Sequence, residues 1–212
     1  MTSQWMKNAP RAGRDLPEST LSIEREKLRV RPVVVGSAGV EDKEAIVQRF
    51  KKAMRRHTAT VSIIATREHG FRYGMAATAI SAVCTDPPAL LICINRTATL
   101  YQPLMRTQRF SVNLLHEDHA DLIGPFSGKL AHEARFLHGA WQDLHGLPVL
   151  DDAQATLFCE VDGELGYGSH DVVIGRVVAV AATGEVAPLL WQDGGHAVAR
   201  ALPTETSLAH NK

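Results

Sequence analysis

Small residues dominate a run that otherwise has the pattern of a β-strand. Residues 74–83 contain one glycine and four alanines, and their only hydroxyl groups belong to Thr78 and Ser81. Strands normally favour large β-branched and aromatic side chains. A strand of small residues gives up that packing and lets a flat molecule lie against its backbone. The run therefore predicts either a binding surface for a flat ligand or a tightly packed inner strand.

Few patterns in the chain serve catalysis by side chains. Cys84, Cys93 and Cys159 form no CxxC pair, and the ten histidines have no cysteine companions at zinc-type spacing. We therefore expect no metal site, and we expect Cys84 and Cys93 to be buried rather than reactive. No GxGxxG follows a strand and no GxxxxGK is present, which argues against Rossmann and P-loop nucleotide sites.

Composition describes a neutral globular protein. Of 212 residues 45% are hydrophobic, and 23 basic side chains balance 23 acidic ones. A neutral chain lacks the basic excess of a dedicated nucleic-acid binder, and no apolar run approaches the length of a membrane span. Because the cysteines show no disulfide pattern, we expect a reducing, cytoplasmic location.

Three parts are expected along the chain. Residues 1–38 are polar and charge-mixed and contain three prolines, so they predict a flexible extension with a short helix near residues 22–28. Residues 39–198 are expected to form one domain, and residues 199–212 a disordered tail.

The domain begins with a predicted amphipathic helix at residues 40–56. Ile46, Val47, Phe50 and Met54 recur at three- and four-residue spacing, as on the apolar face of a packed helix. Short helices are also expected at residues 100–105 and 116–127. Residues 128–152 predict a loop, with Trp141 and residues 147–150 as docking points.

Apolar, β-branched or alternating runs predict the strands. These runs span residues 59–66, 74–83, 89–95, 109–115, 155–165 and 171–182. Pro87 and Pro88 should lie at a corner between strands, because proline donates no ladder hydrogen bond. Strands do not alternate regularly with long helices, so a doubly wound fold is disfavoured. A mainly β fold is expected: a six-stranded antiparallel split barrel with peripheral helices.

An ordered series of segments between Ala45 and Ala197 resembles the short-chain NAD(P)H:flavin reductases, the reductase components of two-component monooxygenases. Its members are Met54–Thr66, Gly74–Ala79, Pro87–Pro88, Cys93–Arg96, Phe110–Leu115, Arg135–Phe136, Gly146–Leu150, Ala155–Val161, Gly168–His170, Ile174–Val177 and Pro188–Trp191. The resemblance implies a Greek-key split barrel of the FMN-binding type, usually a homodimer. It also implies reduction of FMN or FAD by NADH or NADPH and a partner oxygenase that receives the reduced flavin.

The resemblance also implies where flavin binds. The flavin wall would be Met75, Ala76, Ala77, Thr78, Ala79, Ser81, Ala82 and Val83, with Phe126 as a further contact. Asn95, Arg96, Thr97 and Thr99 lie where a strand turns into a helix, a natural anion site for the flavin phosphate. Ser81 is an alternative position for that phosphate. Arg96 is read either as its charged partner or as a surface arginine.

His170 matches the histidine of the family's Gly-Asp-His-like motif and is the candidate group beside the nicotinamide. Ser169 replaces the acidic residue of that motif, so the carboxylate that would orient the imidazole is absent there. Asp171 should point to the opposite face if the strand has begun. The alternative reading of His170 is a residue that caps the start of a strand.

Several activities fit these residues. Hydride transfer between nicotinamide and flavin needs positioning and water exclusion more than acid–base groups, which agrees with the absence of a catalytic triad. Besides a flavin reductase, we consider a flavoprotein that reduces another acceptor, such as a cobalt corrinoid. A non-catalytic flavin- or haem-binding barrel for storage or sensing, and an enzyme similar to pyridoxamine-phosphate oxidase, are the further alternatives.

Overall fold

A computed structural model describes residues 42–182 and 184–202 of the chain. The expected extension at residues 1–38, with its short helix, and most of the expected tail lie outside the described residues. Residues 199–202 have no regular secondary structure. No helix of the described part has the length and apolar character needed to cross a membrane.

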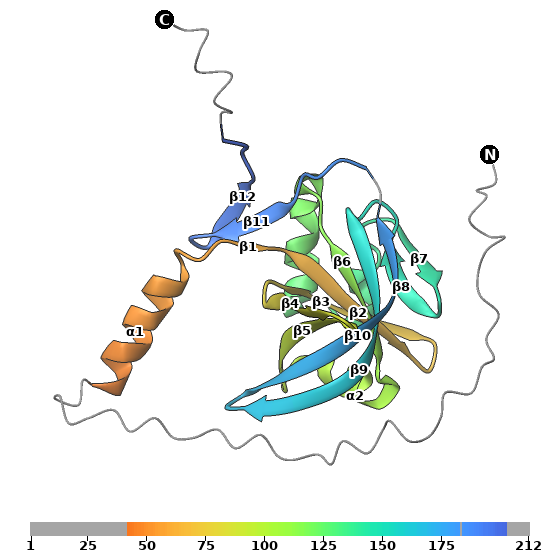
Figure 1. Ribbon diagram of the computed structural model, residues 1–212, viewed down its shortest axis with the longest axis horizontal. Helices are drawn as coiled ribbons and strands as arrows, with labels where there is room; N and C mark the ends of the chain where they lie inside the picture. Colours follow the sequence, from red (N-terminus) through yellow and green to blue (C-terminus); the bar gives the residue numbers. More distant parts are fainter. Residues whose placement is uncertain (1–41, 183, 203–212) are drawn as a thin grey trace, which may run out of the picture. The chain divides into compact units, whose positions relative to one another are not determined.

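Strands make up more of the described chain than helices do (Figure 1). The strands are β1 (Ala59–Thr60), β2 (Ser62–Glu68), β3 (Phe71–Ala77), β4 (Ile80–Thr85), β5 (Pro88–Asn95), β6 (Arg109–Leu114), β7 (Trp141–Leu144), β8 (Leu147–Leu150), β9 (Ala155–Tyr167), β10 (His170–Ala182), β11 (Leu189–Gln192) and β12 (Gly195–Val198). The helices are α1 (Lys43–Met54), α2 (Tyr101–Thr107) and α3 (His132–Arg135), with a 3-10 helix, η3 (Glu117–Leu122), and a short π-helix, η4 (Pro125–Lys129).

The main sheet has seven strands in the order β3-β2-β6-β9-β10-β5-β4, and every pair in it is antiparallel. Its two edge strands, β3 and β4, are joined by Thr78 and Ala79 alone. Such a connection spans at most about 10 Å, so the two edges must approach each other and the sheet must curl. No ladder joins β3 to β4 in the described part. The predicted mainly β, antiparallel split barrel with peripheral helices is confirmed.

Two details of the expected strand pattern are wrong. The small-residue run is not one strand, because the chain leaves the β-ladder at Thr78 and Ala79 and passes from one sheet edge to the other. The main sheet consequently has seven strands rather than six. Residues 128–152 are not a loop, since they contain α3 and the β7–β8 hairpin. His145 and Gly146 both have positive φ, the geometry that turns a tight two-residue hairpin.

The core lies on both faces of the main sheet. Inside the barrel, Ile64, Ile92, Phe110 and Val173 are fully buried together. A Cβ on Gly175 would lie 2.5 Å from Cζ of Phe110, so the aromatic ring requires glycine at this position. A second cluster on the other face is formed by Ile63, Ala65, Leu115, Leu122, Phe126, Phe136 and Leu150. Trp141 packs against this second cluster, and Leu147 and Val149 are buried, as expected of docking points.

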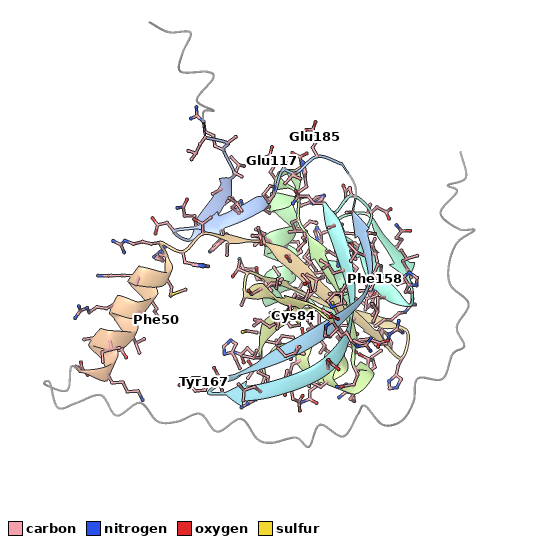
Figure 2. The ribbon with its side chains drawn as sticks, viewed as in Figure 1. Phe50, Cys84, Glu117, Phe158, Tyr167 and Glu185 are labelled. Carbon is pink, nitrogen blue, oxygen red and sulfur yellow. The ribbon has the colours of Figure 1, made fainter. Side chains whose placement is uncertain are left out.

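Helix α1 forms where expected, but its expected packing on the core is wrong. None of its residues is buried, and Ile46, Phe50 and Met54 remain 49%, 62% and 47% exposed. Figure 2 labels Phe50 on this helix. Its end is tied to the β11–β12 turn by Arg55, whose Nε lies 3.1 Å from Oδ1 of Asp193.

A buried amide links four segments of the barrel. Asn113, on β6, is fully buried; its Nδ2 donates to the carbonyl of Ile63 at 3.1 Å. Its Oδ1 accepts from the backbone N–H of Leu150 at 3.0 Å and from Oγ1 of Thr156 at 3.1 Å. One side chain thus satisfies the hydrogen-bonding groups of β2, β8 and β9, which are buried away from water.

Substitution of this amide by an apolar side chain of similar size should be costly. We expect Asn113→Leu to lower the free energy of unfolding by about 2–4 kcal/mol, because the buried N–H, C=O and hydroxyl groups lose their partner. Urea denaturation followed by circular dichroism measures this. Gln142→Leu makes the same change at an exposed strand position and should alter stability by less than about 0.5 kcal/mol. Equal effects of the two variants would contradict the role given to Asn113.

Candidate functional site

A cavity of about 310 Å³ lies between β3, the loop that follows β5, and η4. It is lined by Met75, Ala76, Asn95, Thr97, Ala98, Thr99, Phe126, Ser127, Gly128 and Arg135. One part of this lining is apolar, from the side chains of Met75, Ala76 and Phe126. The other part carries hydroxyl, amide and guanidinium groups. An amphipathic anion with a flat apolar ring would match both parts.

The cavity brings together six of the residues that were expected to bind flavin. They are Met75, Ala76, Asn95, Thr97, Thr99 and Phe126. The structure places the remaining expected wall residues elsewhere. Ala77 is buried in the barrel core, whereas Thr78, Ala79, Ser81, Ala82 and Val83 lie on the β3–β4 connection and on β4, exposed and outside the cavity lining.

Gly74 shows that tight packing also accounts for part of the small-residue run. A Cβ at this position would lie 2.8 Å from Cε1 of Phe126 and 3.0 Å from Cζ of Phe136. These rings and Trp141 pack edge-on or tilted with centroids 5.0–5.3 Å apart. At Gly74 the flat group against the strand therefore comes from the protein itself, and the cavity begins at the next two residues.

The loop after β5 is held by its own side chains. Oδ1 of Asn95 accepts hydrogen bonds from the backbone N–H of Thr97 at 3.0 Å and from its hydroxyl at 2.9 Å. Such a turn is a common use of asparagine. It brings Thr97, Ala98 and Thr99 to the cavity wall.

Arg96 turns away from the cavity. Its Nε donates to Oδ1 of Asp171 at 2.7 Å, and its Nη1 donates to the carbonyl of Gly168 at 3.0 Å. The Arg96 guanidinium lowers the pKa of Asp171, burial opposes this, and a hydrogen bond from Tyr101 lowers the pKa further. The charge of Arg96 is thus compensated by a carboxylate that is only 5% exposed. It holds the β9–β10 turn instead of facing the cavity.

His170 is the first residue of β10 and is exposed. Across the ladder it is paired with Asn95, which does line the cavity. Its Nδ1 lies 2.9 Å from the hydroxyl of Ser169. Ser169 therefore gives the imidazole a hydrogen-bond partner, although the carboxylate of the family motif is absent at this position. Asp171 is buried on the opposite face, as its place in the strand predicted.

Four residues of the cavity lining were not among the expected flavin contacts: Ala98, Ser127, Gly128 and Arg135. Arg135 is only 2% exposed; its Nε donates to the carbonyl of Leu130 at 3.0 Å and its Nη1 to that of Gly74 at 2.5 Å. Burial lowers its pKa. The sequence does contain a signal for Arg135. The Arg135–Phe136 pair is one of the segments that resemble the flavin reductases, but no role was assigned to it.

The thiols and metal-ligand types do not form a second chemical site in the described part. No group of three or more His, Cys, Asp or Glu side chains there is placed to hold a metal ion. Cys159 is buried, which raises its pKa to about 12, and Cys93 is half-buried. The expected burial of Cys84 is wrong, since this thiol, on β4, is exposed.

A larger hollow of about 740 Å³ lies between α1 and the β11–β12 turn. Its lining, which is mostly polar and includes three basic side chains, consists of Lys52, Arg55, Arg56, Gln192, Asp193, His196 and Ala197. It contains no residue expected to bind flavin and offers no aromatic wall. The smaller cavity is therefore the candidate site.

Fold and site together define a split antiparallel barrel with a cavity for an anionic, ring-bearing ligand. The family model described as the flavin reductase like domain matches residues 54–199, so the chain belongs to this family.

Named relatives agree with this assignment. The reductase component of the FADH(2)-dependent resorcinol hydroxylase of Rhizobium sp. (strain MTP-10005) is 36% identical over 159 residues, covering 74% of this chain and 89% of the relative. The FMN reductase (NADH) RutF of Methylorubrum populi is 39% identical over 145 residues, covering 68% of this chain and 72% of the relative. Nitrilotriacetate monooxygenase component B from Mycobacterium thermoresistibile matches in structure with a TM-score of 0.71 at 27% identity, covering 76% and 93%.

The ion pair of Asp171 should make stability depend on pH. Because its pKa is lowered in the folded state, its contribution is complete above the ordinary aspartate pKa of about 3.9 and is lost as the pH falls through the lowered value. We expect wild type to be more stable than Asp171→Asn at pH 7, with a difference that shrinks toward pH 3. Urea unfolding across this range measures it, with Asp151→Asn as the exposed control. A difference that did not change with pH would contradict the assignment.

Proposed function

We propose that this protein is an NADH-dependent flavin reductase that transfers a hydride to FMN and supplies reduced flavin to a partner oxygenase. One observation carries the proposal: a single cavity joins an apolar wall of Met75, Ala76 and Phe126 to a polar wall with Arg135 and Thr97. FMN has the same division between an apolar ring and an anionic phosphate. The names of the relatives support the choice of NADH, FMN and an oxygenase.

The residues of the cavity suit a reaction in which the two nucleotides supply the chemistry. Nicotinamide donates a hydride and flavin accepts it, so the protein must stack the rings and exclude water. Met75, Ala76 and Phe126 present no ionisable group to the ring, and the hydroxyl of Thr99 can donate to an anion at the other end. His170, paired with Asn95 beside this wall, is the group we assign to the nicotinamide side.

Steady-state kinetics test the proposal directly. Purified protein with added FMN should oxidise NADH, followed as loss of absorbance at 340 nm, with FAD and NADPH as parallel arms. Flavin binding without oxidation of either nicotinamide would favour a storage or sensing protein. Reduction of a corrinoid at a higher rate than free flavin would favour the other-acceptor alternative.

The same assay tests His170 with a matched control. We expect His170→Ala to lower kcat/KM for NADH about tenfold or more, because the imidazole assigned to the nicotinamide side is lost, and to leave FMN binding within about threefold. His145→Ala removes another imidazole from a surface turn and should not change these constants. Unchanged NADH kinetics in His170→Ala would remove the role given to this residue.

We also propose that a second copy of the chain completes the functional unit as a homodimer. Leu91, Cys93, Leu165, Val172 and Ile174 share the outer face of β5, β9 and β10; they are half-buried but belong to none of the buried clusters. The apolar stripe of α1 is exposed.

Charge favours a second copy as the cover. Residues 42–56 hold six basic and two acidic side chains, whereas residues 57–202 hold nine basic and fifteen acidic ones. The basic α1 segment of one copy thus matches the acidic body of another, and a two-fold dimer would use both surfaces twice.

Sedimentation equilibrium tests the dimer. Wild type should have twice the chain mass of 23.1 kDa. The double substitution Val172→Glu with Ile174→Glu should give a folded monomer, because two carboxylates would have to be buried in the interface. Val186→Glu changes a loop residue that is 92% exposed and should leave the dimer intact. A monomeric wild type, or a dimer that survives the double substitution, would contradict the proposal.

A further inference from the structure

We propose that Arg135 is the cation that recognises the phosphate of a phosphorylated flavin, so that this cavity selects FMN and FAD over riboflavin. The inference rests on the flavin reductase function proposed above and names the group that sets its flavin specificity. Arg135 takes the place of Arg96 as the expected partner of the phosphate, because the charge of Arg96 is already compensated by Asp171.

Arg135 is a buried charge without a counter-ion in the described part of the chain. Six other arginines there pair with carboxylates: Arg55, Arg67, Arg72, Arg96, Arg106 and Arg176. Arg56 and Arg109 also donate to carbonyl oxygens, but both are exposed. The two hydrogen bonds of Arg135 end instead on the carbonyl oxygens of Leu130 and Gly74. A guanidinium has five N–H donors, so two bonds leave most of its capacity unused. Burial of a charge is costly unless an opposite charge compensates it.

The surroundings of Arg135 in the cavity suit an oxyanion. Thr99 offers a hydroxyl group of the lining, whereas the hydroxyls of Thr97 and Ser127 already donate to Asn95 and to the carbonyl of Ile123. No carboxylate lines the cavity. Gly128 has a φ of 90°, so the turn beside Arg135 adopts a backbone conformation that favours glycine. Arginine binds phosphate oxygens through two parallel N–H bonds more readily than lysine does.

The neighbours of Arg135 hold it in place before any ligand binds. Within α3, the carboxylate of Glu133 accepts from both the backbone N–H and the guanidinium of Arg72 on β3. The ring of His132 stacks on Tyr73 with centroids 4.5 Å apart. Because α3 is fixed to β3 at two further residues, the Arg135 guanidinium does not have to be ordered when phosphate arrives.

The test compares three flavins that share one ring. Riboflavin has no phosphate, FMN has a monophosphate, and FAD has a diphosphate. With NADH as donor, wild type should show kcat/KM for FMN at least about tenfold above that for riboflavin. Arg135→Gln should lower the FMN value about 10- to 100-fold and leave riboflavin within about threefold, because only phosphate loses a charge-assisted bond. A parallel loss for FAD would show that the diphosphate uses the same group.

Two further variants separate recognition from structure. Arg67→Gln removes a guanidinium from a surface ion pair outside the cavity lining, and should preserve the FMN preference. Arg135→Lys keeps the charge without the fork and should keep part of the preference. If Arg135→Gln lowered kcat/KM equally for all three flavins, or kept the FMN preference of wild type, the inference would be overturned.

Direct binding distinguishes failure of this inference from failure of the proposed function. Dissociation constants of FMN and riboflavin, measured by titration calorimetry with wild type and Arg135→Gln, do not require turnover. Absence of NADH oxidation with every flavin would overturn the reductase function, yet a wild-type preference for FMN lost in Arg135→Gln would still support phosphate recognition. Equal affinities of wild type for FMN and riboflavin would overturn it.

Discussion

The two-residue connection between β3 and β4 is the constraint on which the rest of the structure depends. These strands are the opposite edges of a seven-stranded sheet, and Thr78 and Ala79 cannot reach between them unless the sheet curls. Curling encloses the core around Phe110, and it brings β3 across from the loop that follows β5. The cavity opens at this seam, with Met75 and Ala76 on one side and Asn95 to Thr99 on the other. The cavity of this split barrel thus lies at the seam where no β-ladder joins the two edges of the described sheet.

Most of the elements were predictable because their residues carry local signals. The β-branched run at residues 59–66, the alternation at residues 109–115 and the two long strands at residues 155–182 all formed strands. What local pattern does not contain is the partner of a strand. A run of small apolar residues is compatible with one strand or two, and only the pairing of β3 with β2 and of β4 with β5 divides it. The β7–β8 hairpin was missed because His145–Gly146 is a less familiar turn than Asn–Gly.

The site was predictable to the extent that it is made of contiguous segments. The loop from Asn95 to Thr99 reaches the cavity because an asparagine turn shapes it locally. The choice between two arginines was not predictable, because it depends on residues distant in sequence. Asp171 lies 75 residues after Arg96 and compensates its charge. Gly74 lies 61 residues before Arg135 and accepts one of its hydrogen bonds. Charge types can be read from a sequence, but compensation of charge follows from the fold.

Helix α1 extends this argument beyond one chain. A 3.6-residue period predicts that one face of a helix is buried, but it does not predict whether the same chain or another one covers that face. A 12-residue helix has little stability in water without tertiary packing, so exposed Ile46, Phe50 and Met54 describe an unsatisfied surface. The outer face of β5, β9 and β10 is apolar too, but its side chains are half-buried. In the homodimer proposed above, each copy would cover both of these surfaces of the other.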